Sequence, residues 1–131
     1  MSGETDLSTL LKNMTPLLHD GDYAFCTISS LTNIEINEII ASFKEIEGIT
    51  LILKKETADK LKLNYGYIAA WITLTVHSSL EATGLTAAFA TALANEGISC
   101  NVVAAYYHDH IFVAKKDAVR AMAALERLAG A

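Results

Sequence analysis

The sequence predicts an α/β (α+β) fold made of two tandem ferredoxin-like βαββα units, with antiparallel sheets and helices packed on one face. Three observations predict it. The order helix, glycine turn, strand, strand, helix occurs twice, apolar residues alternate along residues 68–76, and the segment from Leu63 to His108 carries two charged residues, Glu81 and Glu96. A segment with so few charges must be covered by the rest of the chain or by a second copy.

Two pairs of short motifs mark the repeat. Lys54-Lys55-Glu56 and Lys115-Lys116-Asp117 each follow an apolar strand and open a helix, whereas His19-Asp20-Gly21 and Asn95-Glu96-Gly97 each end a helix and open a strand. The second pair is further apart in the sequence than the first. The first unit therefore contains an insertion, which we place around residues 29–38.

The first half of the chain is assigned to residues 1–64. Asp6 is the expected N-cap of its first helix, Pro16 is expected to start a short turn, and Gly48 takes the demanding position of a hairpin. The apolar patterns predict helices over residues 7–14 and 56–63, strands over residues 23–28, 39–43 and 49–53, and a loop over residues 29–38.

The second half is assigned to residues 65–131. Its best strand places Ile68, Ala70, Ile72, Leu74 and Val76 on the face toward the core. A capping box of Ser78 and Glu81 precedes a helix that Gly97 ends, and a turn at His108-Asp109 separates the next two strands. The predicted ranges are strands over 68–76, 98–106 and 111–114, a helix from residue 83 or 84 to 95, and a last helix capped by Asp117.

Composition excludes several classes of protein. The chain has 131 residues, a formal net charge of −5 and 52% hydrophobic residues, so it is neither disordered nor a typical nucleic-acid binder. Cys26 and Cys100 are too few for a disulfide framework and are expected to be free thiols. The first residues show no signal peptide, and no stretch is apolar enough to span a membrane. We therefore expect a cytoplasmic protein.

The residues from Gly84 to Ser99, GLTAAFATALANEGIS, resemble the best-known segment of ACT domains. The wider string WITLTVHSSLEATGLTAAFATALANEGISCNVVAAYYHDHIFV is similar to an uncharacterised family of tandem ACT-domain proteins, and TPLLHDGDYAFCTI and EGITLILKKETADKL resemble the other half of that family. ACT domains bind small ligands, often amino acids, at domain interfaces and regulate enzymes. The resemblance implies a non-enzymatic regulatory protein that binds an amino acid or a related carboxylate.

The stretch from His77 to Leu85 is the predicted ligand-binding site. It leaves a strand and enters a helix, where unpaired amide hydrogens and the helix dipole favour a carboxylate. Gly84 allows close approach of the backbone, Ser78 and Ser79 add hydroxyls, and His77 adds a titratable group. The alternative is an ordinary capped helix start. We take His77, Ser78, Ser79, Gly84 and Leu85 as the ligand-binding residues.

Neither a catalytic set nor a cofactor is predicted, because no nucleophile is followed by a base and an orienting group. We assign no metal site, although His108, Asp109 and His110 are the residues that a histidine-based metal-binding protein would use. The other alternative is a protein-interaction or dimerisation module that binds nothing small.

A homodimer is predicted from the helix that follows Gly84. Its residues are almost all small and uncharged, so its outer side should not face bulk water, and another backbone can approach it closely. The predicted partners are thus a small molecule and a second copy of the chain, without nucleic acid or membrane. The small residues are Ala82, Thr83, Gly84, Thr86, Ala87, Ala88, Ala90, Thr91, Ala92 and Ala94.

Overall fold

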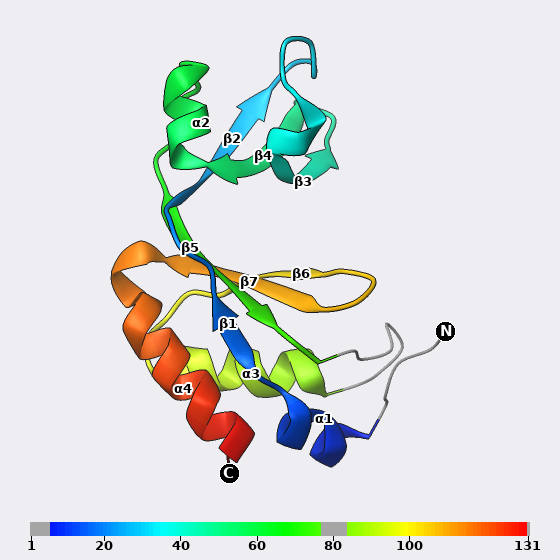
Figure 1. Cartoon of the computed structure of the whole chain (residues 1–131), viewed down its shortest axis with the longest axis vertical. Helices are drawn as coiled ribbons and strands as arrows, with labels where there is room; N and C mark the ends of the chain where they lie inside the picture. Colours follow the sequence, from blue (N-terminus) through cyan, green and yellow to red (C-terminus); the bar gives the residue numbers. More distant parts are fainter. Residues whose placement is uncertain (1–5, 77–83, 131) are drawn as a thin grey trace. The chain divides into compact units, whose positions relative to one another are not determined.

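The computed structural model describes residues 6–76 and 84–130 (Figure 1). The helices are α1 (Leu7–Asn13), α2 (Lys55–Lys60), α3 (Leu85–Asn95) and α4 (Ala118–Gly130), with short 3-10 helices η1 (Ile36–Glu38) and η2 (Lys115–Asp117). The strands are β1 (Pro16–Leu18), β2 (Tyr23–Ile28), β3 (Ile39–Lys44), β4 (Ile49–Lys54), β5 (Ile68–Leu74), β6 (Asn101–Ala104) and β7 (Asp109–Ala114). Among these residues, no helix is both long enough and apolar enough to cross a membrane.

The chain forms two compact units. The continuous unit comprises residues 20–70, and the discontinuous unit comprises residues 1–19 together with residues 71–131. The helix α1 therefore packs in the same unit as α3 and α4, although the continuous unit separates it from them in the sequence. The boundary predicted between residues 64 and 65 stays a prediction. It separates the two sequence repeats, whereas the compact units are separated by their contacts in space.

In the continuous unit, β4 pairs with β3 on one side and with β2 on the other, both antiparallel. The helix α2 contacts β2 and β4 and covers their apolar side. The core consists of the buried residues Ala24, Cys26, Leu51, Leu53 and Ala58. Residues 29–38 stand where a ferredoxin-like unit has its first helix, and they form loop and the single 3-10 turn η1.

In the discontinuous unit, the strands lie in the order β1, β5, β7, β6. The helices α3 and α4 pack together, and α1 contacts both of them (Figure 1). On the strands, Ile72, Leu74, Ile111 and Val113 are fully buried. On the helices, the fully buried side chains are Leu10, Phe89, Leu93, Ala121 and Leu125.

Local chemistry determines where the helices begin and end. The carboxylate of Asp6 accepts from the backbone N–H of Thr9 at 3.0 Å and caps α1. Gly84 precedes α3 with φ +95°, a left-handed conformation that a side chain would strain. At the other end of α3, Gly97 has φ +73°, and the backbone N–H of Ile98 returns to the carbonyl of Leu93 at 3.0 Å.

The structure confirms the predicted fold class of mixed α/β with antiparallel pairing. It corrects the turn predicted at Pro16, which instead begins strand β1. An edge strand tolerates proline because a backbone N–H on its outer side has no partner to lose. The strand predicted over residues 98–106 is shorter, and Asp109 lies in β7 and not in a turn. The predicted capping box at Ser78 and Glu81 lies outside the described residues.

Gly48 is required by close packing of backbone on backbone. A Cβ placed there would lie 2.9 Å from the carbonyl oxygen of Ile28, whereas a Cβ at Gly66 would meet nothing within 4 Å. We expect Gly48→Ala to lower the free energy of unfolding by roughly 1–3 kcal/mol and Gly66→Ala to change it by less than about 1 kcal/mol. Urea denaturation of both variants measures this difference, and equal midpoints would contradict the described packing.

Candidate functional site

Of the predicted ligand-binding residues, the structure describes Gly84 and Leu85. His77, Ser78 and Ser79 lie outside the described residues. The side chain of Leu85 is 3% exposed, so it belongs to the core. A Cβ at Gly84 would lie 3.2 Å from Cδ2 of Leu7 in α1. On the side where a Cβ would project, Gly84 therefore lies against α1.

His108, Asp109 and His110 do not converge. Consecutive residues of a strand point to opposite faces, so Asp109 and His110 in β7 face apart. Asp109 is 7% exposed, and burial raises the pKa of its carboxyl while His108 lowers it. Within residues 6–76 and 84–130, no three side chains of His, Cys, Asp or Glu gather as a metal site.

His110 instead joins three residues that are not among the predicted site residues. The indole Nε1 of Trp71 donates to Nδ1 of His110 at 3.1 Å, and the Thr73 hydroxyl lies 2.9 Å from the same nitrogen. On the other side, Thr73 is 2.7 Å from Nε2 of His19. The His19 ring stacks on Trp71, with ring centroids 3.7 Å apart and planes inclined by 13°. We call His19, Trp71, Thr73 and His110 the two-histidine network.

The two-histidine network is buried at its centre and half-buried around it. Thr73 is 5% exposed, whereas His19, Trp71 and His110 are half-buried. Burial lowers the pKa of both histidines, and the charges of His108 and His19 lower that of His110 further. Both imidazoles are thereby biased toward the neutral form.

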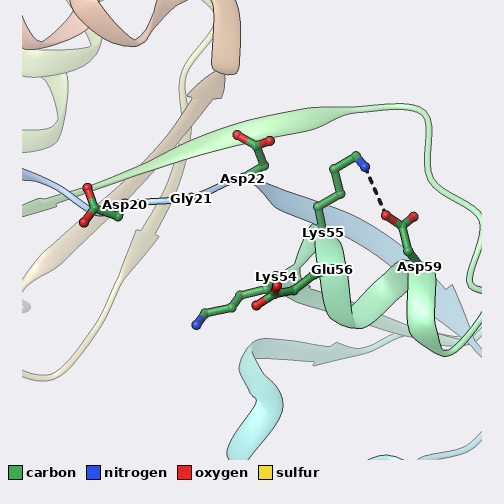
Figure 2. Close-up of a pocket in the computed structure, with 7 residues that line it drawn as sticks. All are labelled: Asp20, Gly21, Asp22, Lys54, Lys55, Glu56 and Asp59. Atoms are coloured by element: carbon green, nitrogen blue, oxygen red, sulfur yellow. Dashed lines mark hydrogen bonds and ion pairs between the residues drawn. The ribbon is translucent and has the colours of Figure 1, made fainter.

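A second cluster of polar residues lines a pocket of about 420 Å³ in the continuous unit (Figure 2). The backbone N–H of Lys55 donates to the carbonyl of Asp22 at 2.9 Å and so holds the start of α2 against the segment that precedes β2. The pocket is lined by Asp20, Gly21, Asp22, Lys54, Lys55, Glu56 and Asp59.

Lys55 and Asp59 form an ion pair in this pocket. Nζ of Lys55 lies 3.0 Å from a carboxylate oxygen of Asp59, and the hydroxyl of Tyr65 donates to the other oxygen. The Tyr65 bond and then the Lys55 bond lower the pKa of Asp59. In Figure 2 the side chain of Lys54 extends away from this pair. The pocket thus lies at an exposed part of the surface and is lined by both acidic and basic side chains. None of the residues that line it is a nucleophile beside a base.

Sequence patterns predict part of the two-histidine network. The alternation along β5 places Trp71 and Thr73 on one face, and the same alternation separates His110 from Asp109. The role of His19 depends on β1 pairing with β5, which the turn predicted at Pro16 excluded. The sequence does not predict the pocket, because the segment before β2 and the start of α2 are brought together by folding, as the bond from Lys55 to Asp22 shows.

Both cysteines are free, as predicted. Cys26 is buried in the core of the continuous unit, and burial raises the pKa of its thiol. Cys100 is half-buried, and burial raises its pKa to about 11. Neither thiol is activated for nucleophilic chemistry.

A family model described as the ACT domain matches residues 2–70, and a second model with the same description matches residues 67–127. No curated protein matches the chain significantly.

Three solved structures are similar. A Vibrio cholerae protein described as of unknown function, possibly a transport protein, is 51% identical over 94% of this chain and 95% of that chain, with a TM-score of 0.83. An Agrobacterium tumefaciens protein is 14% identical over 89% and 90%, with a TM-score of 0.67. The ligand-free regulatory subunit of aspartate kinase from Thermus thermophilus is 11% identical over 89% and 99%, with a TM-score of 0.62. The last two similarities establish the fold.

The raised thiol pKa values predict slow labelling of both cysteines in the folded protein. At pH 8 we expect Cys100 to react with a thiol reagent roughly a hundred times more slowly than in urea, where its pKa returns to about 8.5. Cys26→Ser isolates Cys100, and Cys100→Ser isolates Cys26. Labelling at the rate of the unfolded chain would show that the thiol is not buried.

Proposed function

This chain belongs to the ACT-domain family, and from that premise we propose that it is a non-enzymatic regulatory protein that binds a small carboxylate ligand, an amino acid or a related compound. The observation that carries the proposal is the match of ACT models to both halves of the chain. A regulatory subunit of aspartate kinase has a similar fold over nearly its whole length, which supports a regulatory role for a chain of this size.

We place the ligand at the start of α3, on His77, Ser78, Ser79, Gly84 and Leu85. The first amides of a helix lack partners within it, and Gly84 offers them no side-chain oxygen. A ligand carboxylate can therefore accept from these amides, aided by the helix dipole. Since Leu85 is buried, its contribution is its backbone N–H.

We further propose a cytoplasmic homodimer in which α3 packs on a second copy. Thr86, Ala87, Thr91 and Ala94 lie exposed on α3 and carry no charge. Small side chains permit close approach of another helix, and ACT domains often dimerise. Free thiols in both units are consistent with a reducing compartment.

Ligand binding should raise the melting temperature. A ligand present at 100 times its dissociation constant adds about 2.7 kcal/mol to the free energy of unfolding, which for a chain of this size is a rise of roughly ten degrees. A melting screen over the twenty amino acids and common carboxylate metabolites at millimolar concentration identifies it. If no compound shifts the melt, the interaction-module alternative replaces ligand binding.

The site is tested with a charge reversal. We expect Ser79→Asp to abolish the shift because its carboxylate repels that of the ligand, while Ser79→Asn, of the same size but neutral, retains most of it. A shift that survives Ser79→Asp unchanged would move the site away from α3. Gly84 is unsuited to this test, because a side chain there is strained by the positive φ and lies against Leu7.

The dimer is tested by a charge on the exposed side of α3. We expect Thr91→Glu to halve the mass measured by light scattering at tens of micromolar protein, since a carboxylate would have to be buried in the interface. Val119→Glu, on an exposed position of α4, is the matched control and should leave the mass unchanged. A monomeric wild-type protein would refute the dimer outright.

A further inference from the structure

Asp109 is a buried carboxylate without a hydrogen-bond partner among the described residues. Its side chain is 7% exposed. Burial raises the pKa of its carboxyl, the charge of His108 opposes this, and no hydrogen bond from residues 6–76 or 84–130 contributes. An ionised carboxylate that loses its hydration without gaining a donor destabilises the folded chain. Such a group is typical of a site where a partner is supplied from outside the chain.

The elements around Asp109 supply no strong counter-ion. Lys and Arg are absent from residues 63–114, the part of the sequence that forms β5, α3, β6 and β7. The two arginines of α4, Arg120 and Arg127, both bond to Glu96, which follows the far end of α3. A cation for Asp109 therefore comes neither from these elements nor from the arginines of the neighbouring helix.

The pairing of β7 with β5 places Asp109 at the end of the sheet where α3 begins. The Thr73 hydroxyl lies 2.9 Å from Nδ1 of His110. Two residues earlier in β5, Trp71 stacks on Phe112, which is two residues later in β7, so the two strands run antiparallel. The end of β5, from which the chain leads to α3, therefore lies beside the start of β7. Figure 1 shows both, and the start of α3, at one end of the discontinuous unit.

Asp109 also lies on the face of the sheet that the helices cover. Side chains alternate along a strand, and His110 contacts Thr73 on the opposite face. Asp109 therefore shares the face of Ile111 and Val113, which are fully buried. Its carboxylate is thus directed toward the helix side of the sheet, at the end where α3 begins.

The start of α3 attracts the opposite kind of charge. Its first hydrogen bond runs from the N–H of Ala88 to the carbonyl of Gly84 at 2.8 Å, so the N–H groups of residues 85–87 have no partner within the helix. These amides and the helix dipole favour an anion. One end of the sheet therefore combines groups that bind a negative charge with a carboxylate that needs a positive one.

We propose that Asp109 binds the ammonium group of an amino acid whose carboxylate accepts from the first amides of α3. The inference rests on the proposed function and specifies what its ligand site selects, which is a zwitterion in preference to a simple carboxylate. An ammonium group brings three donors and a full positive charge to the Asp109 carboxylate. A ligand hydroxyl brings one neutral donor, and a keto oxygen brings none.

The ammonium group is tested by repeating the melting screen of the twenty amino acids with their 2-hydroxy analogues. Matched pairs include alanine with lactate, aspartate with malate and phenylalanine with phenyllactate. We expect half of the maximal melting shift at a concentration of amino acid roughly ten to a hundred times lower than that of its analogue, because the hydrogen bond to Asp109 is made by a charged donor. This comparison uses the wild-type protein and so does not depend on the folding of a variant.

Asp109→Asn tests the residue, because the amide keeps the size of the carboxyl and removes its charge. We expect the variant to need at least about tenfold more amino acid for half of the maximal shift, while its response to the 2-hydroxy analogue stays close to that of the wild type. Asp20→Asn is the matched control, made at an exposed carboxyl of the continuous unit, and should respond as the wild type does. Circular dichroism verifies that both variants are folded.

The outcomes separate this inference from the proposed function. If amino acids and their 2-hydroxy analogues shift the melt equally, or if Asp109→Asn responds to amino acids as the wild type does, the ammonium site is refuted and the proposed ligand site stands. If no compound of either series shifts the melt of the wild-type protein, ligand binding itself is refuted, and the ammonium site with it.

Discussion

Strand β5 is the element on which both compact units depend. Its first residues pair with β2 in the continuous unit, and its last three pair with β1 in the discontinuous unit, where β7 is its other neighbour. A strand with partners on both edges must be apolar on the face that meets the helices, and Ala70, Ile72 and Leu74 are fully buried there. A charge at any of these positions would have no water and no counter-ion, which explains why the sequence around β5 contains so few charges.

The same strand explains why the polar groups of the two-histidine network are tolerated. Thr73 occupies the other face of β5, where it is 5% exposed and hydrogen-bonded on both sides. A buried hydroxyl without hydrogen-bond partners would destabilise the fold. His19 and His110 therefore satisfy the Thr73 hydroxyl, and Thr73 in turn satisfies one ring nitrogen of each histidine. The network is a fully connected set, and removal of any member leaves a polar atom of another member without its partner in the network.

The fold was predictable to the extent that it depends on local patterns. The alternation along β5, the apolar runs of β2 and β4 and the glycine after α3 are each readable within a few residues, and the structure confirms them. Features that depend on pairing between distant segments were not readable. Pro16 by itself indicates a turn, and its place in an edge strand follows from contact with Leu74 far along the chain. The association of α1 with α3 and α4 has the same origin, because a compact unit that is interrupted in sequence leaves no mark in local periodicity.

The two-histidine network and the proposed ligand site are connected by contiguous structure. β1 follows α1 after two residues, Met14 and Thr15, and the buried side chains of Leu10 and Met14 anchor this segment. At the start of α1, Cδ2 of Leu7 would lie 3.2 Å from a Cβ at Gly84, so α1 packs directly against the residue that precedes α3. The helix α1 therefore lies between β1 and the backbone at Gly84. Coupling between the two places would need an element with two arrangements that both bias, and α1, which contacts α3 and leads into β1, is the element that joins them.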